Sequence, residues 1–304
     1  MADQNKQSQN LYAGIEAGGT KFNCVIGSSP TDIIARAKFA TTTPEETLLE
    51  TSNFFLEYNR TAGELTSLGL ACFGPVDLKK SSPNYGHITA TPKKYWSNCD
   101  VVGYFKKALD IPIAFDTDVN GAALGEHLYG AARDVDDFIY VTVGTGIGAG
   151  VFVNGRPLNG LVHTEIGHLL VSRGREHHSF ESICPFHENC LTSLAAGPAI
   201  EARWKKPGHE LPIDHEAWDL EAYYLAVMCV NLTLCFSPSL IILGGGVMDQ
   251  SQLYPKIRQQ FEDLMNGYML PPIPLQEYIV APKLPGTSGE VGAIALAQSL
   301  RLFD

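Results

Sequence analysis

Two segments of the chain share one pattern, in which a short glycine-rich turn separates two strand-like runs. The runs are residues 11–15 and 22–26 in the first segment and 138–143 and 147–153 in the second. Because the residues after each turn are rich in β-branched and aromatic side chains, they favour a strand over a helix. The pattern predicts two β-hairpins far apart in the sequence, each opening a part of the chain that also carries helices.

Further runs alternate between the periodicities of helices and strands. Helices are expected near 44–56, 101–109, 119–128, 216–236 and 254–265, and strands at 65–71, 112–115 and 240–243. This alternation implies a mixed or parallel sheet covered by helices, and therefore an α/β protein. A length of 304 residues favours two domains. The stretch 168–190 is rich in His and Cys and fits neither periodicity, so something other than packing is expected to order it.

The net charge, the cysteine content and the N-terminal residues each exclude some classes of protein. With 22 Lys and Arg against 33 Asp and Glu, the net charge of -11 argues against nucleic acid and against an anionic membrane surface. The seven cysteines are odd in number and mostly lie in apolar runs, so a disulfide framework is not expected. The polar residues 1–10 lack the apolar core of a signal peptide, and no run of 18 apolar residues occurs. We therefore expect a cytoplasmic protein.

The glycine turns are candidates for binding phosphate. They are not Walker or dinucleotide motifs, because in both motifs the glycines lead into a helix. Glycine still tolerates positive φ, and its bare N–H group can approach an anion closely. A third glycine turn, 244–246, follows the buried strand 240–243. Each turn alone could be an ordinary hairpin, but as a set they predict a site that grips a polyphosphate from two sides.

A group of carboxylates lies at a predicted junction between a strand and a helix, in the segment Asp116-Thr117-Asp118-Val119-Asn120. A carboxylate there could act as a general base toward a hydroxyl group. Asp118 could instead be only the N-cap of the helix, which is a preferred place for Asp. The residues alone leave both interpretations open.

Soft and borderline metal ligands cluster in the irregular stretch. Cys184, His187 and Cys190 fall within seven residues, and His168 lies 16 positions before Cys184. Two thiolates and two imidazoles complete a closed tetrahedral site, which is typical of structural zinc. His177 and His178 could replace one ligand. A loop with incidental His and Cys, or a disulfide between Cys184 and Cys190, is the alternative.

Four motifs together resemble the ROK family of sugar kinases. They are Gly-Ile-Glu-Ala-Gly-Gly-Thr-Lys (14–21), Val-Gly-Thr-Gly-Ile-Gly-Ala-Gly (143–150), Glu-Ile-Gly-His (165–168) and Gly-Gly-Gly-Val-Met (244–248). Within that family, the segments 72–77 and 85–93 look most like the fructokinases. The resemblance runs from about residue 14 to the C-terminal helix.

This resemblance implies an actin-like ATPase (ribonuclease H-like) fold, with duplicated α/β domains around a central cleft. It implies a small domain at 1–121, a larger one at 122–290 that holds the zinc loop, and a helix at 291–304 that packs back onto the first domain. It also implies ATP, Mg²⁺ and Zn²⁺ as cofactors and a homodimer.

The resemblance assigns roles to individual residues. ATP would be bound by Gly18, Gly19, Thr20, Lys21, Gly144, Thr145, Gly146, Gly244, Gly245, Gly246 and Val247. Glu16 would order Mg²⁺ through water. Asp118 becomes the catalytic base, and the sugar would be held by Gly74, Pro75, Thr117, Asn120, Glu165, His168 and Thr192. The zinc ligands would be His168, Cys184, His187 and Cys190.

Two positions depart from the family pattern. Thr117 stands where relatives have a sugar-holding Asn, and Thr192 stands where they usually have a Glu. A neutral hydroxyl makes weaker hydrogen bonds than a carboxylate, so we expect weaker sugar binding at Thr192.

The activity implied is ATP-dependent phosphorylation of D-fructose to fructose 6-phosphate. The alternatives are a broader hexokinase acting on mannose or glucose, and a sugar sensor without turnover. The sugar-responsive repressors of the family carry a DNA-binding segment before this core. Only ten residues precede the first predicted strand here, so a repressor is not expected.

Overall fold

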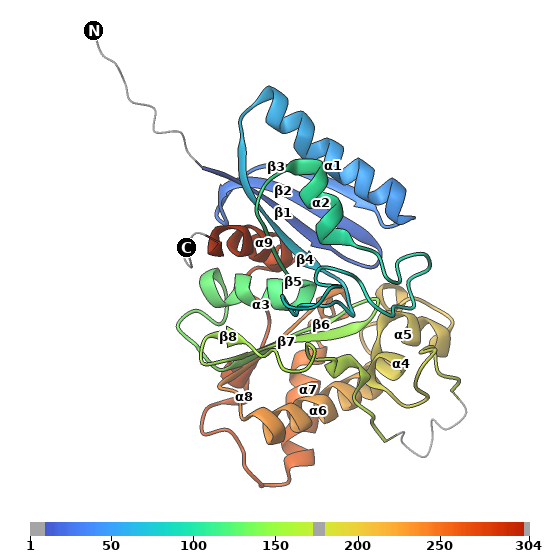
Figure 1. Cartoon of the computed structure of the whole chain (residues 1–304). Coiled ribbons are helices and arrows are strands. Elements are labelled where there is room, and N and C mark those ends of the chain that lie inside the picture. The colour runs from blue at the N-terminus through green and yellow to red at the C-terminus, as the bar shows by residue number, and fades with distance from the viewer. Residues whose placement is uncertain (1–9, 173–179, 301–304) are drawn as a thin grey trace. The chain divides into compact units, whose positions relative to one another are not determined.

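The structure is a computed structural model that describes residues 10–172 and 180–300. It contains two five-stranded mixed sheets, which Figure 1 shows from one side. The first has the order β3-β2-β1-β4-β5, with β1 (Leu11–Ala17), β2 (Lys21–Ser29), β3 (Asp32–Ala40), β4 (Leu65–Cys72) and β5 (Ile113–Thr117). In this sheet β1, β2 and β3 pair antiparallel, whereas β4 pairs parallel with both β1 and β5.

The second sheet repeats this topology. Its order is β10-β9-β6-β7-β8, with β6 (Phe138–Val143), β7 (Ile147–Val153), β8 (Arg156–Pro157), β9 (Leu240–Gly244) and β10 (Ile279–Val280). Here β6, β7 and β8 pair antiparallel, and β9 pairs parallel with β6 and β10. Each sheet therefore consists of an antiparallel three-stranded part that opens with a glycine-turn hairpin, followed by two parallel strands.

The chain divides into two compact units, one around each sheet. The first unit comprises residues 1–125, 160–163 and 287–304, and the second comprises 126–159 and 164–286. The short piece 160–163 thus leaves the second unit and belongs to the first.

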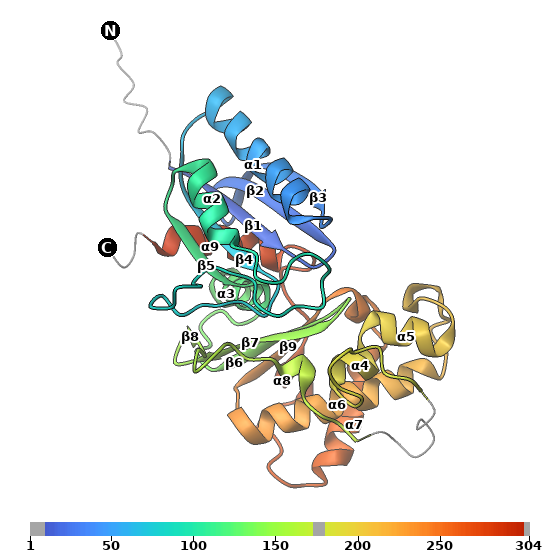
Figure 2. The ribbon, with the colours of Figure 1, turned by 45° about the vertical axis from the view of Figure 1, so that its right-hand side comes forward.

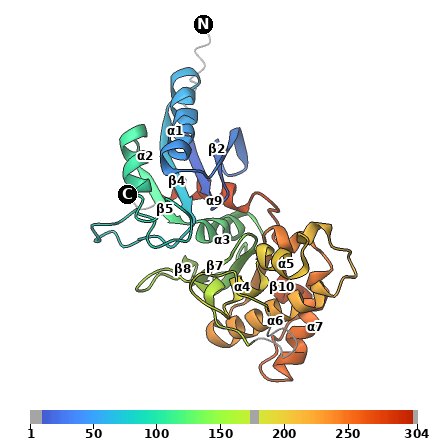
Figure 3. The ribbon, with the colours of Figure 1, turned by 90° about the vertical axis from the view of Figure 1, so that its right-hand side faces the viewer.

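Helices cover both faces of the first sheet (Figures 1 and 3). Helices α1 (Pro44–Thr61) and α2 (Val101–Leu109) lie on one face, and α9 (Ser288–Ser299) lies on the other beside α3 (Asp118–Tyr129). Helix α1 begins where its sequence predicts, because Thr43 accepts a hydrogen bond from Glu46 N and Pro44 occupies the first turn. The predicted C-terminal helix is found as α9, from Ser288 to Ser299, while residues 301–304 lie outside the described residues.

Glycines allow α9 to lie directly against its neighbours. A Cβ added at Gly292 would come within 1.7 Å of the backbone oxygen of Gly121 in α3, and one at Gly69 in β4 within 1.9 Å of the oxygen of Ala293. No side chain fits at either contact, so backbone packs on backbone there. This close packing fixes the position of α3, whose first residues carry the predicted catalytic carboxylate.

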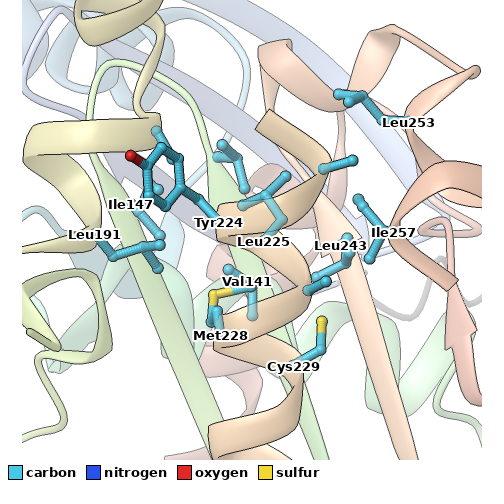
Figure 4. Packing of buried hydrophobic residues seen from close by; sticks show 14 of the residues in the cluster. Val141, Ile147, Leu191, Tyr224, Leu225, Met228, Cys229, Leu243, Leu253 and Ile257 are labelled. Atoms are coloured by element: carbon cyan, nitrogen blue, oxygen red, sulfur yellow. The ribbon is translucent and has the colours of Figure 1, made fainter. Parts of the chain in front are cut away.

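The second unit is built on the long helix α6 (Ala217–Phe236), which packs against α7 (Leu253–Met265) under the sheet (Figure 2). Figure 4 shows the buried contacts of this core, in which Tyr224, Leu225 and Met228 of α6 face the strands. Within residues 10–172 and 180–300 the remaining helices are α4 (Leu191–Ala195), α5 (Gly197–Trp204) and α8 (Leu275–Tyr278), together with the 3₁₀ turns η1 (Ile166–His168), η3 (Gly208–Glu210) and η4 (Gly246–Asp249).

Helix α6 is long and apolar enough to cross a membrane when judged by length and composition. Half of its most apolar stretch is buried inside the protein, however, and Trp218 and Tyr224 are completely covered. A buried core helix of a globular protein has these properties too, and the contacts of α6 are those of a core helix.

The sequence did not predict β3. Its residues alternate between exposed and half-buried, and none is fully buried. This is the pattern of an edge strand, in which Arg36 and Lys38 interrupt the apolar residues and weaken the strand signal.

Candidate functional site

The first glycine turn is held by hydrogen bonds from outside it. Gly18 N donates to Lys21 O at 2.9 Å and closes the turn, while the Thr41 hydroxyl donates to Gly18 O at 2.7 Å and Thr41 N donates to Thr20 O at 2.9 Å. A Cβ at Gly19 would meet nothing within 4 Å. The surface at Gly19 is therefore open, as expected where an anion approaches the backbone.

The second and third turns adjoin each other in the second unit. Gly144 N donates to Gly146 O at 2.8 Å, and Gly197 N, at the start of α5, donates to Gly144 O at 2.8 Å. Gly245 lies so close to β6 that an added Cβ would be 2.5 Å from the backbone of Val143. The start of α5 was not predicted as part of this arrangement, because a single Gly-Pro pair carries no binding signal by itself.

Among the glycines of the three turns, only Gly245 has a positive φ, of +90. At the other turn glycines what matters is the missing side chain, since Gly19, Gly144 and Gly246 all face open space. The requirement for glycine there is thus one of access rather than of backbone conformation.

Glu16 lies at the end of β1 beside the first turn. Asn23 Nδ2 donates to its Oε2 at 2.8 Å, and an added Cβ on Gly289 would be 2.2 Å from its carboxyl carbon. Burial raises the pKa of the Glu16 carboxyl, partly opposed by the hydrogen bond from Asn23. A nearby cation would favour the ionised form, which fits the predicted contact with a water of Mg²⁺.

The segment predicted to carry the base lies where β5 runs into α3. Asn120 N donates to Thr117 Oγ1 at 3.1 Å, so Thr117 supplies the side-chain cap of α3. Asp118 Oδ1 accepts from the neighbouring Val119 N at 2.9 Å. The interpretation of Asp118 as only the N-cap is therefore wrong, because the hydroxyl of Thr117 makes the capping bond. Asn120 is buried, and its Nδ2 donates to Asp116 Oδ1 at 2.7 Å.

Gly74 and Pro75 follow the end of β4 in the same unit. The carbonyl oxygen of Pro75 accepts from both Thr89 N at 2.7 Å and Thr89 Oγ1 at 3.1 Å. This pair of bonds fixes the turn after β4, and Val76 N in turn donates to His163 Nε2 at 3.0 Å. The contact of Gly74 and Pro75 with a sugar stays a prediction.

The four predicted metal ligands converge in the second unit. The ligand atoms of His168, Cys184, His187 and Cys190 all lie within 4.8 Å of one another. Cys184 Sγ is 3.8 Å from His168 Nδ1 and 3.8 Å from His187 Nδ1, separations that suit a tetrahedral ion with bonds of about 2.0 to 2.3 Å. All seven cysteines are free, so the alternative of a Cys184–Cys190 disulfide is wrong. The competing ligands His177 and His178 lie outside the described residues.

The protonation of this cluster favours a cation. Burial raises the pKa of the Cys190 thiol to about 11, and burial lowers the pKa of His168. Without a positive ion the Cys190 thiol therefore keeps its proton at pH 7. A divalent ion would replace the thiol proton and compensate the buried thiolate.

Backbone pairing holds the ligands together. Leu191 N donates to Leu169 O and Val171 N donates to Asn189 O, both at 2.9 Å, which places Cys190 opposite Leu170. The pairing brings the end of the metal loop next to η1, whose preceding residue is the exposed Glu165. Glu165 therefore lies next to the segment that carries the metal cluster, and its orientation by a bound ion stays a prediction.

Thr192 has a contact that its predicted role did not include. Its Oγ1 accepts from Ile147 N at 3.2 Å and lies 3.4 Å from Ile147 O, at the first residue of β7. The hydroxyl therefore ties α4 to the strand that follows the second glycine turn. Its contact with a sugar stays a prediction.

The two sheets of identical topology, each opening with a glycine-turn hairpin, define an actin-like ATPase fold. The family model "ROK family" matches residues 12–300, and the chain belongs to this family.

Two relatives illustrate the similarity in sequence. A fructokinase of Pediococcus pentosaceus is 44% identical over 95% of this chain and 98% of its own length. A fructokinase of Lactococcus lactis subsp. cremoris is also 44% identical, over 95% and 97%.

Among solved structures, a ROK family glucokinase from Streptomyces griseus in complex with glucose and AMPPNP matches with a TM-score of 0.78 at 23% identity. The match covers 95% of this chain and all of that one. A ROK hexokinase from Thermus thermophilus matches with a TM-score of 0.76, also at 23% identity, over 97% and 100%.

Proposed function

We propose that this chain is an ATP-dependent fructokinase, which transfers the γ-phosphoryl group of ATP to D-fructose and forms fructose 6-phosphate. The observation that carries the proposal is the 44% identity to two fructokinases. In each comparison the match extends over nearly the whole of this chain and of the relative. A glucokinase of Halalkalibacterium halodurans is far less similar, at 24% identity.

The fold by itself does not select this activity. A ROK family transcriptional regulator matches this chain with a TM-score of 0.75, although the match covers only 79% of that regulator. The sequence relatives and the chemistry of the side chains, rather than the fold, support an enzyme.

Asp118 is the residue we assign as general base. Its carboxylate would accept the proton of the attacking sugar hydroxyl as the phosphoryl group is transferred. The geometry supports this assignment because the cap of α3 is made by Thr117, and the chain is anchored on both sides of Asp118 by hydrogen bonds to Asp116. Glu165 and Asn120 would bind sugar hydroxyls.

The nucleotide and the metals have separate places in the proposal. We assign the bare backbone at Gly19, Gly144 and Gly246 to the phosphates and nucleoside of ATP, and Glu16 to a water of Mg²⁺. Mg²⁺ neutralises the phosphate charge when it is bound.

The cluster of His168, Cys184, His187 and Cys190 would hold one structural Zn²⁺ through two thiolates and two imidazoles. We further propose a cytoplasmic homodimer.

A sugar panel tests the activity. The purified chain is assayed for ADP formation with ATP and Mg²⁺ on fructose, mannose, glucose and N-acetylmannosamine. We expect kcat/KM for fructose to exceed that for every other sugar by at least about tenfold, or roughly 1.4 kcal/mol of barrier. Similar values for glucose or mannose would identify a broader hexokinase. Sugar binding without ADP formation would identify a sensor. Light scattering of the same sample tests the dimer.

A further inference from the structure

His163 is a buried side chain that the chemistry above does not use. The piece of chain that ends with it, residues 160–163, belongs to the first unit, although the chain before and after it belongs to the second. Leu161 and Val162 are 95% and 68% exposed, whereas His163 is only 7% exposed. The imidazole, rather than its two apolar neighbours, is therefore what packs into the first unit.

The hydrogen bond to His163 defines the state of its ring. Val76 N donates to Nε2 at 3.0 Å, and a backbone N–H can only donate. Nε2 is therefore unprotonated, and in the neutral ring the proton is on Nδ1. Val76 directly follows Gly74 and Pro75, so this bond fixes the backbone of a turn that the sequence predicts to bind substrate.

Asp116 connects His163 to the start of α3. Asp116 lies close enough to His163 to interact with it electrostatically. Asp116 Oδ1 accepts from Thr117 N and from Asn120 Nδ2, both at 2.7 Å. Burial raises the pKa of the Asp116 carboxyl, while these two hydrogen bonds oppose that rise. Burial raises the pKa of the Tyr85 phenol and the charge of Asp116 adds to that rise, so Tyr85 also lies near this carboxyl. The two residues that donate hydrogen bonds to Asp116, Thr117 and Asn120, lie on either side of Asp118 in the sequence.

We propose that His163 is a positioning residue for the phosphoryl transfer, a role that rests on the proposed fructokinase activity. It accepts the N–H of Val76 and faces Asp116, and thereby holds the turn after β4 and the first turn of α3 in one arrangement. The base must meet the sugar hydroxyl within hydrogen-bond distance, and a displacement of about 1 Å can lower the rate by about 10²-fold. His163 itself does not exchange a proton with substrate in this role.

Two variants separate the hydrogen bond from the volume of the ring. His163→Phe keeps a planar ring but cannot accept from Val76 N, whereas His163→Gln offers an amide oxygen as acceptor and an N–H₂ group toward Asp116. The matched control is His215→Phe. His215 Nδ1 also accepts a backbone N–H, that of Ala217 at 3.1 Å, but at the start of α6 in the second unit.

Steady-state kinetics with fructose and ATP, together with thermal unfolding, give the readout. We expect His163→Phe to lower kcat with fructose by at least about tenfold while KM for ATP changes less than twofold. His163→Gln should stay within threefold of wild type. His215→Phe should lower the unfolding temperature but leave kcat within twofold.

Three results would overturn the role of His163. They are a His163→Phe kcat within threefold of wild type, an equal loss in His163→Gln and His163→Phe, or an equal kcat loss in His215→Phe. If His163→Phe does not fold, Asp116→Asn decides, since a tenfold loss of kcat supports the role and a loss below threefold overturns it. A wild-type chain that phosphorylates no sugar would instead overturn the proposed function itself.

Discussion

Asp118 is the general base proposed for the phosphoryl transfer, and its replacement can be tested without loss of the fold. We expect Asp118→Ala to lower the turnover of fructose by about 10² to 10⁴, the usual contribution of a general base. The fold should persist, because the capping bond of α3 comes from Thr117 and the Asp116–Asn120 bond does not involve Asp118. The measurement is steady-state turnover beside thermal unfolding of the same sample. Turnover above about a tenth of wild type would remove Asp118 from the role of base.

Some of the candidate functional residues could be predicted from the sequence, and others could not. His168, Cys184, His187 and Cys190 were predictable, because ligands of these types at such spacing have few other uses, and the structure brings them together. His163 was not predictable. A single histidine has no pattern, and its partner Val76 N is a backbone group 87 residues away. Only the fold creates that contact.

At the scale of one element, α6 contains a buried acid that makes stability depend on pH. Glu221 is 1% exposed, and burial raises the pKa of its carboxyl well above its ordinary value, partly opposed by the charge of Arg203. The folded protein thus keeps this proton at a pH where the unfolded chain has already lost it. Because the folded state then binds more protons, the free energy of unfolding falls as pH rises above the ordinary carboxyl range.

Replacing this carboxyl with an amide tests that dependence. Glu221→Gln keeps the shape without an ionisable group, so we expect it to raise the unfolding temperature at pH 8 relative to wild type. At pH 4.5 and below the difference should shrink. The measurement is thermal unfolding between pH 4 and pH 8, with the exposed Glu216→Gln at the start of the same helix as control. A variant less stable than wild type at pH 8 would mean that the ionised pair with Arg203 stabilises the fold.

The elements that the sequence predicted share a property that β3 lacks. Strands such as β6, with five of its six residues buried, and helices such as α2 present continuous apolar faces, so their periodicity is visible. Strand β3 lies at a sheet edge and alternates with Arg36 and Lys38. Helix α5 is short, and its start is held by a hydrogen bond from Gly197 N to Gly144 O. Contacts with neighbouring elements stabilise such elements, and these contacts cannot be read from the local sequence.

At the scale of the whole molecule, the duplicated topology gives each unit its own glycine-turn hairpin but leaves the metal cluster in only one of them. His168, Cys184, His187 and Cys190 all belong to the second unit. The cluster closes the irregular segment onto η1, and Thr192 ties α4 to the first residue of β7. Loss of the ion should therefore loosen a defined part of one unit rather than the whole chain.

Removal of zinc with a chelator tests this expectation. Elemental analysis of protein purified without added metal should give one zinc per chain, and less than about half an equivalent would contradict the site. After chelation at pH 7, amide hydrogen exchange should accelerate at residues 164–171, at residues 181–196 and at the start of β7, because the buried thiol of Cys190 regains its proton and the ligands lose their common partner. Exchange in β1, β4 and α9, which belong to the first unit, should stay unchanged.

Re-addition of zinc controls for chelator effects and should restore the slow exchange, with an affinity that rises with pH because Cys190 must lose a proton whose pKa is about 11. Cys235→Ser, a change at an exposed cysteine outside the cluster, is the matched variant and should retain one zinc. Equal acceleration in both units would mean that the ion stabilises the whole molecule cooperatively. No acceleration near Glu165 would mean that the ion does not orient this carboxylate, and the proposed link between the metal and sugar binding would then be wrong.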